Sequence, residues 1–205
     1  RPSHLALQTA SLFVDNGAKA VLYPLLDISA LPFDLPDMNA LDLFIFTSQN
    51  AVPLFMHKML AANLDARSFG KSEIYCIGPK TRDALLAYGI RADGMADEYR
   101  AEGIVEMLKE TDLSGKRVCL PRARGARDYL VDALRERGAE VLEIPVYETV
   151  LPKDASKEGF LSALAGADTV VFTSPSGIRH AVELLGDDRD LLRPKRLAAI
   201  GPVTL

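Results

Sequence analysis

The chain carries the same set of landmarks twice, and this duplication limits the folds that it can adopt. Four features recur in the same order at nearly constant offset, between 121 residues (138 − 17) and 126 residues (173 − 47). The matching pairs are Gly17 and Gly138, Pro24 and Pro145, Ile45–Ser48 and Val171–Ser174, and Ile77–Thr81 and Ile200–Thr204. Such regular self-similarity predicts an internal duplication and therefore two similar lobes.

Short apolar runs alternate with helical patterns along the chain. The runs expected to form strands lie at 20–23, 43–48, 74–77, 117–120 and 141–144. Residues 3–16 predict a helix with Leu12 and Phe13 facing inward, and a later helix is expected to bury Tyr129. Because strands alternate with helices, we predict an α/β fold with two doubly wound, flavodoxin-like parallel sheets.

Two proline-led stretches, Pro24–Ile28 and Pro145–Val150, match each other at 121 residues (145 − 24). We expect them to be two parallel crossings that connect the lobes. The predicted first lobe then comprises residues 1–28 with 148–205, and the inserted second lobe comprises 29–147. Since Arg1 matches Arg122 and the chain ends at Leu205, the first lobe is expected to lack its first strand and its C-terminal part.

Composition and motifs argue against several classes of protein. The net charge of −4 disfavours a nucleic-acid binder, and no apolar run is long enough to span a bilayer. Cys76 and Cys119 lie in apolar runs and are interpreted as reduced core thiols of a cytoplasmic protein. The three histidines have no metal-ligand spacing, so we expect no metal, and nucleotide binding has no motif in its favour, since neither a Walker loop nor a dinucleotide fingerprint occurs.

Polar residues follow the predicted strands, where ligands of doubly wound sheets bind. The candidates that also open a helix are Ser48, Gln49, Asn50, Ser174, Ser176 and Gly177. Helix capping and anion binding by free N–H groups both explain these residues, and the sequence leaves the two alternatives open. Thr81 and Thr204 occupy matching places in the repeated Gly-Pro segments.

Arginines and one tyrosine complete the set of candidates. Arg122, Arg124 and Arg127 lie at a strand end and helix start, where they form either a solvated basic turn or a site for carboxylates or phosphates. Tyr147 lies at the predicted junction of the lobes, where a phenol can pack or donate a proton.

These motifs together resemble the uroporphyrinogen-III synthase family. The matching segments are Phe46–Val52, Ile77–Thr81, Pro145–Thr149, Phe172–Gly177 and Ala199–Thr204. The resemblance implies two α/β lobes with the substrate between them, and a cofactor-free lyase of tetrapyrrole (heme) biosynthesis. Its substrate would be hydroxymethylbilane, a linear tetrapyrrole with eight carboxylates, which is closed to uroporphyrinogen III with ring D inverted.

The family resemblance also implies roles for individual residues. Tyr147 matches the tyrosine proposed to assist departure of the substrate hydroxyl, whereas Ser48, Thr81 and Thr204 match polar positions that would orient the substrate. We expect a monomer, and the sequence leaves open a fusion to another enzyme of the pathway. The alternatives are a non-catalytic two-lobed protein that binds a small anion and, with no phosphate loop in its favour, a nucleotide-using transferase.

Overall fold

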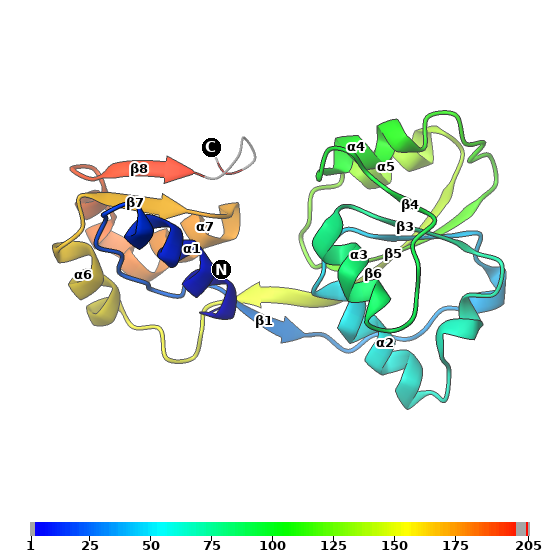
Figure 1. Ribbon diagram of the computed structural model, residues 1–205, viewed down its shortest axis with the longest axis horizontal. Helices are drawn as coiled ribbons and strands as arrows, with labels where there is room; N and C mark the ends of the chain where they lie inside the picture. Colours follow the sequence, from blue (N-terminus) through cyan, green and yellow to red (C-terminus); the bar gives the residue numbers. More distant parts are fainter. Residues whose placement is uncertain (1–2, 200–203, 205) are drawn as a thin grey trace. The chain divides into compact units, whose positions relative to one another are not determined.

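The computed structural model describes residues 3–199 and 204 and divides the chain into two compact α/β units (Figure 1). Unit 1 comprises residues 1–29 and 149–205, and unit 2 comprises residues 30–148. The predicted α/β class is confirmed. Unit 2 contains the larger sheet and is described first.

Five parallel strands form the main part of the unit 2 sheet, in the order β6-β5-β2-β3-β4. Their bounds are β2 Leu43–Phe46, β3 Glu73–Cys76, β4 Gly94–Met95, β5 Arg117–Ala123 and β6 Glu140–Val150. The helices are α2 Ala51–Ala61, α3 Pro79–Leu86, α4 Ala101–Met107 and α5 Tyr129–Glu136, with short 3₁₀ turns at Met38–Ala40 and Ala66–Phe69. The sequence patterns predicted these strands and α-helices except the two-residue strand β4, and they did not predict the two 3₁₀ turns.

The central strand β2 is covered on both faces of the sheet. Leu43 and Ile45 pack into a cluster with buried residues of α4 and α5. Phe44 and Phe46 alternate with them and contact Phe55 of α2 edge to face, at ring-centroid distances of 6.0 and 5.9 Å. Because successive side chains of a strand point to opposite faces, the continuous apolar run of β2 supplies both cores.

Unit 1 repeats part of this arrangement. Its elements are α1 Ser3–Asp15, α6 Lys157–Ala165, β7 Thr169–Phe172, α7 Pro175–Leu185, the 3₁₀ turn Gly186–Leu192 and β8 Arg196–Ala199. The parallel pair β7–β8 has the offsets from β2–β3 that the sequence repeat predicts, 126 residues (169 − 43) and 123 residues (196 − 73). In the described chain β7 has one strand neighbour where β2 has two, and it is correspondingly less buried.

The chain passes from one unit to the other within β1 (Asp27–Ala30) and returns within β6. The two strands are neighbours in the sheet, which gives the predicted two-strand connector. They run in opposite directions, as the arrows in Figure 1 show, so the expectation of parallel crossings is wrong. The reason is topological, because one strand leads out of unit 1 and the other leads back into it.

Two further expectations for unit 1 are wrong. Ala20–Tyr23 is irregular rather than a strand. Its counterpart at 141–144 pairs with β5, whereas no strand in the described part of the chain pairs with Ala20–Tyr23. Leu12 and Phe13 of α1 were expected to be buried but are 64% and 41% exposed, since no described element covers this face of the helix.

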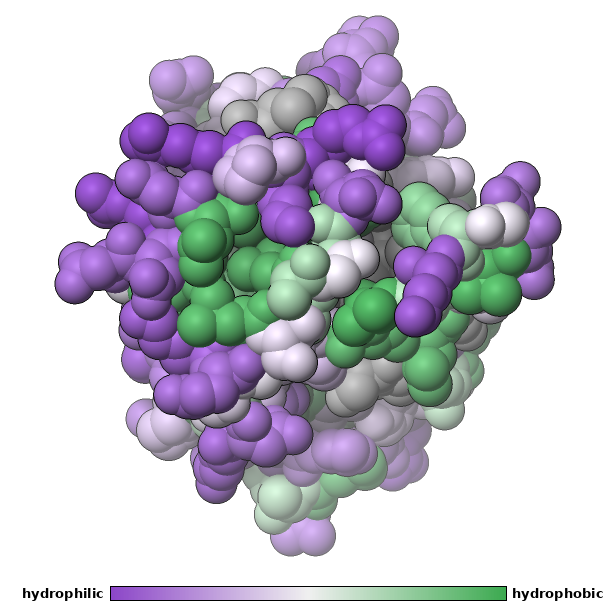
Figure 2. Space-filling model, turned by 90° about the vertical axis from the view of Figure 1, so that its left-hand side faces the viewer, coloured by the Kyte–Doolittle hydropathy of each residue, from purple (hydrophilic) through white to green (hydrophobic). Residues whose placement is uncertain are grey.

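Figure 2 faces unit 1, and hydrophobic residues are also visible on that surface. In unit 2, Tyr129 likewise lies exposed at the first position of α5, while Leu130 and Leu134 fill the core as predicted.

None of the helices described by the structure is long and apolar enough to cross a membrane.

Gly103 provides a test of the packing around α4. A Cβ at this position would collide with the backbone carbonyl oxygen of Glu98, which cannot move without shifting the loop before the helix. We expect Gly103→Ala to lower the free energy of unfolding by about 2 kcal/mol or more, despite the better helix propensity of alanine. Urea denaturation measures the loss.

The matched control for this variant is Glu106→Ala in the same helix. Glu106 is exposed and forms an ion pair with Lys109 of the kind that contributes little to stability. Its replacement should change the free energy of unfolding by roughly 0.5 kcal/mol at most. Equal stability of the Gly103 and Glu106 variants would contradict the described packing.

Candidate active site

A β-bulge in β6 sets the direction of Tyr147. The parallel pairing of β5 with β6 runs from Arg122↔Pro145 directly to Ala123↔Tyr147, so Val146 has no partner on β5. Pro145 has no N–H to donate to a neighbouring strand, and proline within a sheet is typically found at such bulges. Val146 and Tyr147 are consequently buried in succession, at 0% and 6% exposure, where regular alternation would bury only one of them.

The inward phenol of Tyr147 meets the residue that follows β2 by two positions. Tyr147 Oη donates a hydrogen bond of 2.9 Å to Ser48 Oγ, which also accepts 3.1 Å from the backbone N–H of Asn50. The backbone carbonyl of Tyr147 accepts 2.7 Å from the N–H of Arg124. The side chain of Tyr147 is thus held by a residue just after β2, and its backbone by a residue just after β5.

The Arg122 side chain supports the turn after β5 from inside the protein. Only 6% of the side chain is exposed, and its guanidinium donates 3.1 Å to Glu143 and 2.6 Å to the backbone carbonyl of Arg127. We predicted Arg122 as a substrate ligand from its position in the sequence. The structure instead engages both ends of its guanidinium within the fold, which favours a structural role.

Arg124 and Arg127 are the accessible cations of the same turn, with side chains 58% and 50% exposed. Arg124 pairs with Glu148 at 3.0 Å, next to Tyr147, and Arg127 pairs with Glu102 at 3.3 Å. A hydrogen bond from its own backbone N–H, together with Arg127 and Arg100, holds the pKa of the Glu102 carboxyl below its ordinary value. Both guanidinium groups are therefore positioned at the surface and neutralised by carboxylates of the protein itself.

The two predicted helix-start sites differ in their hydrogen bonds. At α7, Ser174 Oγ accepts 3.2 Å from the N–H of Gly177, and Ser176 Oγ accepts 3.1 Å from Arg179. At α2, Asn50 is the N-cap residue and makes no capping bond with its side chain. Ser174 thus acts as a helix cap, one of the two alternatives that the sequence left open.

The remaining candidates are Gln49, Thr81 and Thr204. Gln49 is partly exposed beside Ser48, and Thr81 is buried in the first turn of α3, at 3% exposure. Thr204 is buried at 6% exposure. Arg1, Gly201 and Pro202 fall outside the described residues, so the second Gly-Pro segment cannot be compared with the first.

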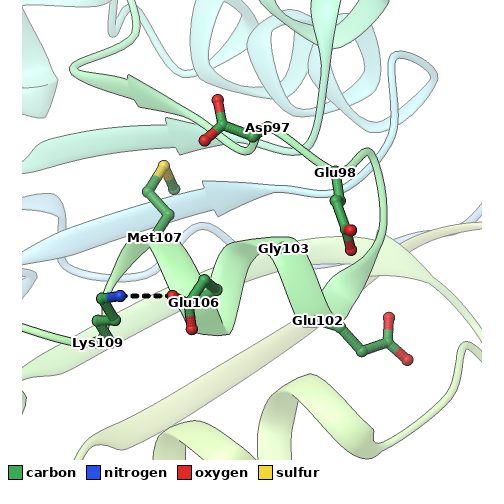
Figure 3. Close-up of a pocket in the computed structure, with 7 residues that line it drawn as sticks. All are labelled: Asp97, Glu98, Glu102, Gly103, Glu106, Met107 and Lys109. Carbon is green, nitrogen blue, oxygen red and sulfur yellow. Dashed lines mark hydrogen bonds and ion pairs between the residues drawn. The ribbon is translucent and has the colours of Figure 1, made fainter.

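An open pocket of about 590 Å³ lies elsewhere in unit 2, between α4 and the loop that precedes it (Figure 3). Its lining residues are Asp97, Glu98, Glu102, Gly103, Glu106, Met107 and Lys109. The single cation among them is already bound to Glu106 at 2.6 Å, as the dashed line in Figure 3 shows. Four carboxylates against one occupied ammonium make this pocket unsuitable for an anionic ligand.

No three side chains of His, Cys, Asp or Glu lie close enough to hold a metal ion within residues 3–199 and 204. Both cysteines are free and buried, and burial raises the pKa of each thiol. A low thiol pKa is what activates cysteine as a nucleophile, so these residues have the character of core thiols.

Fold and site together define a two-lobed α/β protein that gathers a phenol, a serine hydroxyl and exposed arginines at the carboxyl ends of one sheet. The family model for uroporphyrinogen-III synthase HemD matches residues 8–205. The chain therefore belongs to the uroporphyrinogen-III synthase family.

Individual proteins agree with this assignment. A putative uroporphyrinogen-III synthase of Methanothermobacter thermautotrophicus is 31% identical over all of this chain and 85% of its own length. The uroporphyrinogen-III synthase of Synechococcus elongatus is 30% identical over 92% of this chain and 75% of its own length. The crystal structure of a mutant enzyme from Thermus thermophilus covers 98% of this chain and 83% of its own, with a TM-score of 0.68 at 22% identity, and so supports the fold.

The structural role of Arg122 leads to a test of stability. Replacing it by methionine leaves the Arg127 carbonyl without its buried donor and leaves Glu143 with only its exposed partner Arg135, which typically costs about 2 kcal/mol. We expect Arg122→Met to lower the free energy of unfolding by that amount, whereas Arg124→Met, at an exposed pair, should change it by about 1 kcal/mol at most. An Arg122→Met protein as stable as the parent, with weakened substrate binding only, would restore Arg122 as a ligand.

Proposed function

We propose that this chain is an active uroporphyrinogen-III synthase, which closes hydroxymethylbilane to uroporphyrinogen III with loss of water and inversion of ring D. The match of the family model over residues 8–205 carries the proposal. The hydrogen-bonded pair of Tyr147 and Ser48 supports it, because it puts a proton donor at the place where ligands of doubly wound sheets bind.

In this mechanism the Tyr147–Ser48 pair assists departure of the substrate hydroxyl as water. The electrophilic azafulvene that results is attacked by the substituted carbon of ring D, and the spiro intermediate then opens and closes again with that ring turned over. Because the intermediate is intrinsically reactive, most of the remaining task is to hold a flexible chain in one folded pose.

The carboxylates of the substrate have two kinds of partner in this account. Arg124 and Arg127 are exposed and can exchange Glu148 and Glu102 for carboxylates of the substrate. We propose that the polar positions predicted from the sequence orient the substrate further. These positions are Gln49, Asn50, Thr81, Ser174, Ser176, Gly177 and Thr204.

We also propose that the protein works as a monomer in the cytoplasm. Free, buried cysteines are typical of reducing compartments. No comparison favours the alternative of a two-lobed binding protein without catalysis.

The decisive experiment mixes the protein with freshly generated hydroxymethylbilane and identifies the product isomer. The type III ring is expected, since the unassisted reaction closes the chain without inversion and gives type I. In Tyr147→Phe, loss of general acid assistance should lower the rate of type III formation by about 10²-fold or more. If the parent protein gave only the type I isomer, the proposed synthase activity would be refuted. A near-normal rate in Tyr147→Phe would show that Tyr147 is not needed to protonate the departing hydroxyl.

The arginine pair makes a separate prediction about binding. We expect Arg124→Ala/Arg127→Ala to raise KM roughly tenfold, equivalent to about 1.4 kcal/mol, with little change in kcat, because these cations contact parts of the substrate remote from the reacting carbon. Steady-state kinetics at low ionic strength measures the effect.

The control is Arg117→Ala, which removes a half-exposed arginine from the opposite end of the same strand β5. Its KM should remain that of the parent. An unchanged KM in the double variant, or an equal increase in the control, would contradict the assignment of Arg124 and Arg127.

A further inference from the structure

The hydrogen bonds between Tyr147 and Ser48 order their two protons. A serine hydroxyl has one hydrogen and two lone pairs. Ser48 Oγ accepts from Tyr147 Oη at 2.9 Å and from the Asn50 N–H at 3.1 Å, so both lone pairs are occupied. Its hydrogen is then the only one of the pair directed away from both partners, and within the described residues it has no acceptor.

Burial also makes Ser48 more accessible to the substrate than Tyr147. Tyr147 is 6% exposed, and its hydroxyl hydrogen is engaged by Ser48. Ser48 is half-buried, at the point where β2 has ended and α2 has not begun. A substrate hydroxyl at this edge of the sheet reaches the serine more readily than the phenol.

From this order we propose that Ser48 is the residue that gives its proton to the departing hydroxyl, and that Tyr147 resupplies Ser48. The inference rests on the proposed function and changes the assignment of the reacting atom within it. Ser48 becomes the catalytic residue that touches the substrate, and Tyr147 acts through it.

The transfer balances as a two-proton relay. The hydrogen of Ser48 Oγ passes to the hydroxymethyl oxygen while the carbon–oxygen bond breaks with its electron pair, and water leaves. The hydrogen of Tyr147 Oη passes to Ser48 Oγ, so the negative charge comes to rest on the phenolate. When the ring finally closes, the carbon of ring D that forms the new bond loses its hydrogen as a proton, which returns along the same path.

The relay explains why a serine needs the tyrosine. An alkoxide is a much stronger base than a phenolate, whose parent phenol has a pKa of about 10. Serine alone is therefore a poor acid, and coupling to Tyr147 avoids the alkoxide. If Tyr147 gave its proton directly to the substrate, Ser48 would only orient the phenol ring of Tyr147. The serine hydroxyl would then be dispensable for the chemical step.

Single-turnover formation of the type III isomer tests the relay in four variants. We expect Ser48→Ala to lose about 10²-fold or more, as Tyr147→Phe does. The Ser48→Ala/Tyr147→Phe double variant should be no slower than either single one, because residues that act as a unit are not additive. Ser48→Thr keeps the hydroxyl and should recover activity to within about tenfold of the parent.

A proton inventory supplies a readout that a purely structural role of Ser48 would not change. Rates of the parent and of Ser48→Thr, measured in mixtures of H₂O and D₂O, should follow a curved dependence on deuterium fraction, because two protons move together. Direct donation by Tyr147 gives a straight line. Since Ser48→Thr retains the hydroxyl and both accepted bonds, this readout remains available if Ser48→Ala fails to fold.

The control for the serine is Ser72→Ala, which removes a half-buried hydroxyl that donates 2.7 Å to the Leu41 carbonyl just before β3 begins. It should retain the parent rate. Ser48→Ala activity within about threefold of the parent, beside an impaired Tyr147→Phe, or a straight proton inventory, would overturn the relay while leaving the enzyme intact. Absence of the type III isomer from the parent protein would instead refute the proposed function.

Discussion

The geometry of the candidate site depends on one irregularity in the sheet, the bulge at Val146. Without the extra residue, Tyr147 would follow the alternation of β6 and turn away from the side on which Val146 is buried. With it, the phenol reaches Ser48 and the Tyr147 carbonyl reaches the N–H of Arg124. The buried Arg122 fixes the same turn through its hydrogen bond to the Arg127 carbonyl. The bulge and the basic turn therefore stabilise each other.

The two copies of the duplicated pattern have different roles in this account. β2 is buried and flanked by two strands, and the serine two residues beyond its end accepts the bond from Tyr147. Its counterpart two residues beyond β7, Ser174, caps α7 instead. A serine that recurs at a 126-residue offset (174 − 48) thus accepts from a phenol as well as from the Asn50 N–H in one unit, and caps a helix in the other.

Much of the fold follows from local sequence signals, because apolar runs mark the strands and glycines mark where helices end. The strands β2 and β7, and likewise β3 and β8, have the lengths and offsets that the repeat predicts. The failed strand at Ala20–Tyr23 shows the limit of such signals, since a strand also requires a partner. The exposed Leu12 and Phe13 show the same limit for a helix, whose apolar face indicates burial only where another element covers it.

The site was less accessible to prediction, because its contacts join distant parts of the sequence. The bond between Tyr147 and Ser48 spans 99 residues, and nothing in either local pattern specifies it. The proline within the strand pattern at 145 was a signal for the bulge. Spacing alone did not distinguish the buried Arg122 from the exposed Arg124 and Arg127, since three arginines in one short turn differ only in which of them the fold encloses.

Neutron diffraction from a crystal of the deuterium-exchanged protein tests the central claim most directly, because it locates exchanged hydrogens on hydroxyl groups. The account predicts a deuterium on Tyr147 Oη that points at Ser48 Oγ, with an oxygen–oxygen distance near 2.9 Å, and a second deuterium on Ser48 Oγ that points away from the phenol. A deuterium of Ser48 directed at Tyr147 Oη, or a Tyr147 ring turned so that no hydrogen bond joins the two oxygens, would contradict it.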